Sequence, residues 1–170
     1  LTTVMKPTVA LVHGGCFGGG TGIVAACDIV IASEDAIFAI TEARWGVMAG
    51  IILPHLNAAI GPRYVRRYAL TCERFGPARA LELGLIHQVC PTGDLDAAAA
   101  PVIDQLLMSA PEALAQSKYR TLNEAGLLLD DAAGAALVAE HALKRQSAEA
   151  VEGLASFAEK RDPAWYPGPA

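Results

Sequence analysis

Six glycines crowd into the ten residues 13–22 (HGGCFGGGTG), near the start of the chain. The residues before this stretch, 8–12 (TVALV), are apolar and rich in β-branched side chains, and residues 22–27 (GIVAAC) continue without a helix breaker. This order predicts a strand, a glycine turn and a helix. The first amides of a helix have no internal acceptor, so such a junction suits an anion or an oxygen that becomes anionic during a reaction.

Two familiar glycine motifs do not fit this stretch. A dinucleotide fingerprint counted from Gly18 and Gly20 would need its third glycine at Ile23, and a phosphate loop would need lysine where Thr21 stands. Two interpretations remain. The glycines make either a tight turn that lets a helix pack closely on a sheet, or a site where backbone amides stabilise an oxyanion.

Composition restricts the classes of protein further. The chain has 170 residues, 53% of them hydrophobic, which suits one globular domain, and its net charge of −5 argues against a nucleic-acid or anionic membrane surface. Its apolar runs are shorter than the roughly 18 residues that span a bilayer. The four cysteines show no C-x-x-C spacing and the four histidines are scattered, so we expect no metal site and reduced thiols in a cytoplasmic protein.

The rest of the chain divides into two parts near Gly93. We expect residues 1–93 to form an α/β core, and residues 94–170 to form a helical subdomain. Strands are predicted at 29–32, 37–40 and 85–89, and helices at 51–60, 62–71, 77–83, 95–109, 111–125, 130–145 and 148–160.

Several motifs occur in a recognisable order: the glycine stretch, the strand pair, the segment TEARWGVMAG at 41–50, and the closing EGLASFAEKR at 152–161. Together they resemble the enoyl-CoA hydratase/isomerase (crotonase) superfamily over essentially the whole chain. The resemblance implies a crotonase-like α/β fold of repeated strand-turn-helix units with a C-terminal helical oligomerisation subdomain, in a homo-trimer or hexamer. Family members usually begin with several further strands, so we interpret the chain as the C-terminal two-thirds of such a protein, with the N-terminal part missing.

The resemblance also assigns roles to residues. Gly19, the middle glycine of a triplet, would donate its backbone N–H to the thioester oxygen, and Glu42 would be the general acid/base. Phe157 and Lys160 would help to hold the CoA nucleotide. The CoA thioester is then the substrate, and no separate cofactor or metal is implied.

Two positions depart from the family pattern. Thr41 stands where a proline is usual, and Gly22 stands where hydratases typically carry a second glutamate. A small residue at position 22 would enlarge the pocket, which suits hydratases of the methylglutaconyl-CoA or isohexenylglutaconyl-CoA type. Arg44 could then pair with a distal carboxylate of the substrate, or it could simply cover the surface.

The expected function is therefore addition of water to the 2,3-double bond of an enoyl-CoA in acyl-CoA catabolism. A single carboxyl can also move a proton between two carbons, so an isomerase or a hydratase/lyase of the same superfamily is an alternative. The missing second glutamate leaves another alternative, a non-catalytic crotonase-like fragment or paralogue.

Overall fold

The structure is a computed structural model, and it describes residues 1–169. The elements are, in chain order, β1 (Val9–Val12), β2 (Gly15–Phe17), α1 (Gly19–Ala25), β3 (Ile29–Ser33), β4 (Ile37–Ala39), the 3₁₀ helices η1 (Glu42–Trp45) and η2 (Gly50–Ile52), α2 (Leu53–Thr71), α3 (Pro77–Leu83), β5 (Gln88–Cys90), α4 (Leu95–Met108), α5 (Pro111–Glu124), α6 (Asp131–Arg145) and α7 (Ala148–Glu159). Among the described helices, none combines the length and the apolar composition that crossing a membrane requires.

The strands form two small parallel sheets. One has the order β1-β3-β5, and the other pairs β2 with β4. Strand β2 lies inside the glycine stretch, where the sequence predicted only a turn. Its register, with Cys16 opposite Phe38 and Phe17 opposite Ala39, comes from pairing with β4 and not from the β propensity of its own residues.

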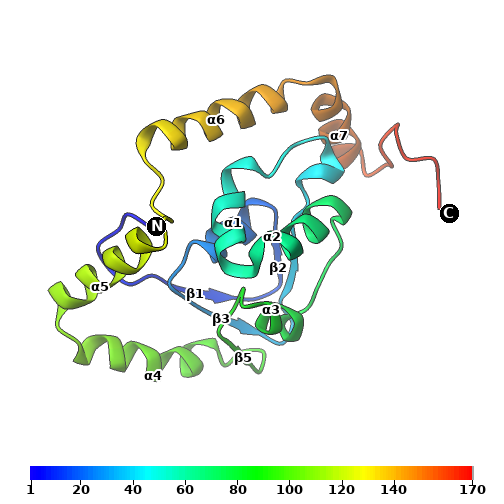
Figure 1. The fold of residues 1–170 in the computed structure, drawn as a ribbon. Helices are drawn as coiled ribbons and strands as arrows, with labels where there is room; N and C mark the ends of the chain where they lie inside the picture. Colours follow the sequence, from blue (N-terminus) through cyan, green and yellow to red (C-terminus); the bar gives the residue numbers. More distant parts are fainter. Residues whose placement is uncertain (170) are drawn as a thin grey trace.

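The core lies between the strands and the helices that follow them. Figure 1 shows α1 and α2 beside the strands, α4 below them, and α6 and α7 along the opposite side. Phe38, Ile40 and Leu56 are at most 1% exposed, and the Phe38 ring stacks on Phe75 with their centroids 5.8 Å apart. The α/β architecture of strand-turn-helix units expected from the sequence is therefore confirmed.

Two predicted elements differ from the observed ones. The helices predicted at 51–60 and 62–71 form the single element α2, which is broken at Gly61 by a non-helical backbone with φ 75°. The strand predicted at 85–89 begins later, at Gln88. Leu85 and Ile86 are buried in the loop after α3, so their apolar character reflects burial in the core and not strand pairing.

The helical part that begins after Gly93 packs directly on the core. Ala99 of α4 is 1% exposed and lies against Ile31 and Cys90, and Val102 packs beside them. The division into residues 1–93 and 94–170 stays a prediction, and residue 170 lies outside the described residues.

Helix α5 is fixed to the N-terminal segment by one lysine. Lys118 Nζ lies 2.8 Å from Asp28 Oδ2 and also donates to the backbone carbonyls of Leu1 and Lys6. The Asp28 carboxylate accepts two further hydrogen bonds from the amide and hydroxyl of Thr8. Burial alone would raise the pKa of Asp28, but the hydrogen bonds from Lys118 and Thr8 outweigh it and lower the pKa.

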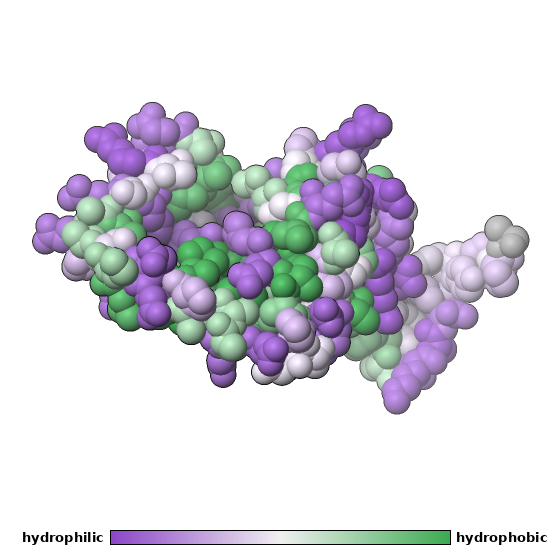
Figure 2. Space-filling view, turned by 90° about the horizontal axis from the view of Figure 1, so that it is seen from below, coloured by the Kyte–Doolittle hydropathy of each residue, from purple (hydrophilic) through white to green (hydrophobic). Residues whose placement is uncertain are grey.

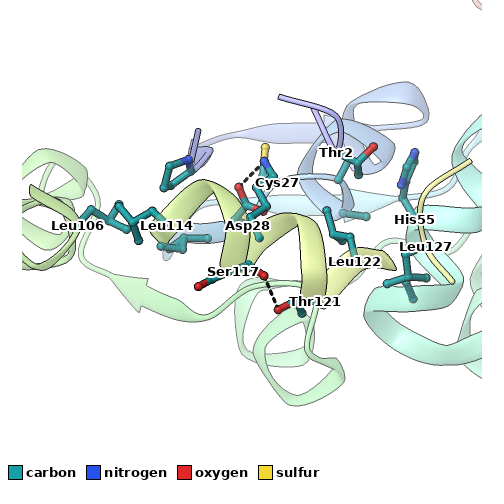
Figure 3. Close-up of a pocket in the computed structure, with 16 residues that line it drawn as sticks. Thr2, Cys27, Asp28, His55, Leu106, Leu114, Ser117, Thr121, Leu122 and Leu127 are labelled. Carbon is teal, nitrogen blue, oxygen red and sulfur yellow. Dashed lines mark hydrogen bonds and ion pairs between the residues drawn. The ribbon is translucent and has the colours of Figure 1, made fainter. Parts of the chain in front are cut away.

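This ion pair borders a cavity of about 450 Å³, which leucines of α4 and α5 and the following loop line. Figure 3 shows Asp28 between Leu114 on one side and Leu122 on the other, with His55 of α2 beside Leu127. The Lys118 side chain is only 7% exposed. Its three hydrogen bonds use all the donors of an ammonium group, which indicates a structural role.

We expect Lys118→Met to lower the free energy of unfolding by about 2–3 kcal/mol, because it leaves the Asp28 carboxylate without its cation. The exposed pair of Lys144 with Glu149 offers a control, and Lys144→Met should cost less than about 1 kcal/mol. Urea unfolding of both variants measures the difference, and equal losses would contradict the structural role of Lys118.

The pH dependence of this effect has a definite sign. The folded-state pKa of Asp28 is below its ordinary value of 3.8, so the ion pair contributes its stability above pH 3.8. That contribution is lost as the pH falls through the lower folded-state pKa. The difference between wild type and Lys118→Met should therefore shrink in this acidic range.

Candidate active site

The parallel pairing of β2 with β4 brings two loops together at one end of the sheet. Strand β2 ends at Phe17 opposite Ala39, the last residue of β4, and the Gly18 amide donates to the Ala39 carbonyl over 2.9 Å. Because carboxyl ends of parallel strands meet at the same edge, the residues that follow them become neighbours. Those residues are Gly18 and Gly19 on one side, and Thr41 and Glu42 on the other.

Gly18 turns the chain from β2 into α1. Its φ of 54° lies in the region that favours glycine, and the Gly18 carbonyl accepts from both the amide and the hydroxyl of buried Thr21. Helix α1 then begins at Gly19. Within residues 1–169 no carbonyl or side chain accepts from the Gly19 amide, which leaves that N–H available to a ligand.

The carboxyl group of Glu42 lies beside this turn. A Cβ placed on Gly18 would be 3.2 Å from Glu42 Oε1, so the carboxyl and the glycine backbone are in contact range. The other oxygen, Oε2, is buried and has no hydrogen-bond partner in the described part of the chain. Burial raises the pKa of Glu42, while backbone hydrogen bonds at Glu42 and Thr41 and the nearby His141 oppose that rise. A carboxyl with a raised pKa can both take and return a proton near neutral pH.

Gly19 and Glu42 line one cavity of about 380 Å³. Apolar side chains form most of its wall, namely Trp45, Val47, Met48, Ala49, Ile51, Ile52 and Leu154. A low-polarity wall strengthens the electrostatic interactions inside the cavity and suits an acyl chain. The structure thus brings together the two residues to which the sequence resemblance gave chemical roles.

Two residues of this cavity were not found by sequence reasoning. His141 and Arg145 come from α6, about 100 positions after Glu42 in the chain, and both line the cavity. The His141 Nδ1 lies 3.1 Å from the Met48 carbonyl, which holds α6 against η2. The two residues are four positions apart, so both lie on one face of the helix. The sequence pattern alone does not indicate which part of the molecule that face covers.

The expectation that Gly22 enlarges the pocket is wrong. Gly22 is buried, and a Cβ at this position would collide with the Ile52 side chain. Ile52 therefore fills the place of the missing side chain and presents an apolar surface to the cavity. A glutamate at position 22 could reach the cavity only if Ile52 moved away.

Three other residues lie outside this cavity. Arg44 is exposed and donates to the Thr71 carbonyl over 3.3 Å, which favours its interpretation as a surface residue. Phe157 is 61% exposed and packs its ring against Trp45 at a centroid distance of 4.8 Å. Lys160 ends α7 with φ 54°. A role of Phe157 and Lys160 toward CoA stays a prediction.

Helix α7 packs closely against η1, the element that carries Glu42 and Trp45. Gly153 allows this approach, because a Cβ at Gly153 would collide with the backbone of Trp45. The close contact fixes one wall of the cavity, where Trp45 and Leu154 meet.

Gly153→Ala should displace α7 and lower the free energy of unfolding by about 1–3 kcal/mol, as overpacking typically does. Gly134→Ala in α6 is a matched control, since its added Cβ meets nothing within 4 Å and should raise helix stability by up to about 1 kcal/mol. Urea unfolding followed by tryptophan fluorescence tests both. A stable Gly153→Ala would show that α7 does not depend on this contact.

Comparison with known proteins identifies the family to which the chain is related. The family described as enoyl-CoA hydratase/isomerase matches residues 1–167. A carnitinyl-CoA dehydratase of Escherichia coli K12 is 34% identical over 167 residues, covering 94% of this chain and 63% of that protein. A putative enoyl-CoA hydratase of Thermus thermophilus is 32% identical over 161 residues, covering 95% and 63%.

The fold agrees with solved structures of the same class. The crystal structure of a putative enoyl-CoA hydratase from Mycobacterium avium paratuberculosis superposes with a TM-score of 0.86 at 37% identity, covering 96% of this chain and 64% of that one. The chain belongs to the enoyl-CoA hydratase/isomerase (crotonase) family. It spans about 63% of the length of the curated relatives that it matches.

Proposed function

We propose that this chain carries the acid/base and oxyanion residues of an enzyme that adds water to the 2,3-double bond of an enoyl-CoA. The observation that carries the proposal is the buried, unpartnered Oε2 of the Glu42 carboxyl beside the free Gly19 amide in one apolar cavity. Membership of the family supports an acyl-CoA substrate.

The two groups divide the reaction between them. The Gly19 N–H binds the thioester oxygen, which gains negative charge as water adds to C3. The Glu42 carboxylate takes a proton from that water as its oxygen bonds to C3, and the resulting carboxylic acid then gives a proton to C2. The net change is one water added, with Glu42 returned to its starting state. A single carboxyl suffices because it acts first as base and then as acid.

The acyl group is proposed to be branched or dicarboxylic, of the methylglutaconyl or isohexenylglutaconyl type. Support comes from the segment TEARWGVMAG and from a cavity whose wall is apolar except near Glu42, His141 and Arg145. The relatives named as carnitinyl-CoA dehydratases belong to the same reaction class, because dehydration is the reverse of hydration.

Isomerisation of a double bond is a second candidate. It needs one group that removes a proton from one carbon and returns it to another, and Glu42 is the single carboxyl that lines this cavity among the described residues. A hydratase/lyase would need the same first steps. Product analysis of the intact protein separates these activities.

Assembly into a trimer or hexamer is also proposed. Three apolar residues of α4 differ in their surroundings. Val102 packs on the core and Leu106 lines the cavity of Figure 3, whereas Leu107 is 77% exposed. Figure 2 views the face on which α4 lies and shows hydrophobic residues gathered near its middle, bordered by hydrophilic ones. Such a patch favours association.

Glu42→Gln should lower turnover of an enoyl-CoA by about 10²–10⁴-fold while leaving acyl-CoA binding nearly unchanged, because the amide keeps the shape but transfers no proton. The same change removes a buried group whose charged form is disfavoured. The variant should therefore be more stable than wild type as the pH rises through the raised pKa of Glu42, and this advantage should fade in acid. Turnover assays and urea unfolding at two pH values check both halves. Undiminished turnover would falsify the role of Glu42.

Gly19→Pro tests the amide directly. Proline is tolerated at the first position of a helix and has no N–H to donate, so turnover should fall about 10²–10³-fold with the fold retained. Gly19→Ala is the control, because its Cβ would meet nothing within 4 Å and its amide is kept. Circular dichroism verifies folding. Equal activity of the two variants would exclude the Gly19 amide from the reaction.

A further inference from the structure

We propose that Arg145 recognises an anionic group on the acyl chain, so that this site prefers carboxylated acyl-CoAs over neutral and cationic ones. The inference rests on the proposed function and names the residue that selects the substrate. The sequence offered Arg44 for such a role, but Arg44 points to the Thr71 carbonyl outside the cavity.

The observation that carries the inference is a guanidinium without a partner at the cavity. Arg145 is the last residue of α6 and lines the same cavity as Gly19 and Glu42. Lys144, the preceding residue of α6, is by contrast paired with Glu149. Within residues 1–169, Arg145 takes part in no ion pair or side-chain hydrogen bond.

The position of Arg145 is set by contacts earlier in α6. His141, one turn before it, is anchored on the Met48 carbonyl, and Glu140 approaches the backbone at Gly50 without lining the cavity. The helix therefore directs His141 and Arg145 at the cavity, and turns its nearest acidic residue toward η2. The cation beside the cavity therefore comes from the last turn of a helix and not from a loop.

The charges at the cavity favour an anion. Its ionisable lining residues are Glu42, His141 and Arg145, and burial disfavours the charged form of Glu42. Arg145 is exposed where it meets the cavity, the rest of whose wall is mostly apolar, and among the described lining residues it is the one permanent cation. A guanidinium binds a carboxylate with paired, charge-assisted hydrogen bonds, and it repels a quaternary ammonium group.

The same chemistry could serve a phosphate of CoA, because both ligands offer anionic oxygens. The acyl group is favoured, since Arg145 shares its cavity with Glu42 and Gly19, where the reacting carbons would lie. An experiment distinguishes a contact with a CoA phosphate from a contact with a carboxylate of the acyl group. A phosphate contact acts on every acyl-CoA alike, whereas an acyl contact acts only on the carboxylated one.

Calorimetry with three saturated, unreactive ligands tests the proposal: glutaryl-CoA, butyryl-CoA and γ-butyrobetainyl-CoA. The intact protein is compared with Arg145→Gln, Arg145→Lys and the control Arg63→Gln, whose residue is exposed on α2 away from the cavity. Wild type should bind glutaryl-CoA about 10-fold or more tightly than butyryl-CoA, and γ-butyrobetainyl-CoA least tightly.

Arg145→Gln should abolish the preference for glutaryl-CoA, change butyryl-CoA binding less than about twofold, and improve γ-butyrobetainyl-CoA binding. Arg145→Lys should keep part of the preference, and Arg63→Gln all of it. A preference that survives Arg145→Gln, or an equal loss for glutaryl-CoA and butyryl-CoA, would overturn the inference. Failure of wild type to bind any of the three would instead overturn the proposed acyl-CoA function, and the inference with it.

Discussion

The parallel pairing of β2 with β4 is the constraint on which the site depends. Each strand has three residues, and their pairing aligns Cys16 with the buried Phe38 and Phe17 with Ala39. Because the two strands end at the same level, the glycine turn and the Glu42 loop leave the sheet side by side. A shift of one residue in this register would turn the side chains to the other face and separate the amide of Gly19 from the carboxyl of Glu42.

The surroundings of Glu42 illustrate a conflict between stability and chemistry. A buried carboxyl oxygen without a hydrogen-bond partner costs free energy, typically about 1–3 kcal/mol. The fold tolerates this cost because neighbouring contacts fix the loop: the Gly46 amide closes η1 on Ala43, and α7 packs against Trp45 at Gly153. Such an oxygen is left free to bind a water or a substrate proton.

Local patterns in the sequence predicted the parts of the fold that local interactions determine. The bounds of α3 follow from Pro77 at its start and Gly84 at its end, and the helix occurs where expected, at 77–83. Strand β2 could not be predicted, because its residues become extended only by pairing with β4. The role of Ile52 beside Gly22 and the arrival of His141 at the cavity depend on helix packing between distant segments, and neither leaves a periodic signal.

The cavity takes its wall from residues between Gly18 and Leu154, so one small volume joins the first helix to the last two. Helices α6 and α7 contact each other, and they contact the rest of the molecule mainly through η2 and η1. Any molecule that occupies the cavity would bridge these layers, and its binding free energy would add to the cost of opening them. The C-terminal helices would then exchange their amide hydrogens more slowly in the occupied protein. A ligand held by a few atoms near Glu42 would thus slow the local opening of α7, more than 100 residues further along the chain.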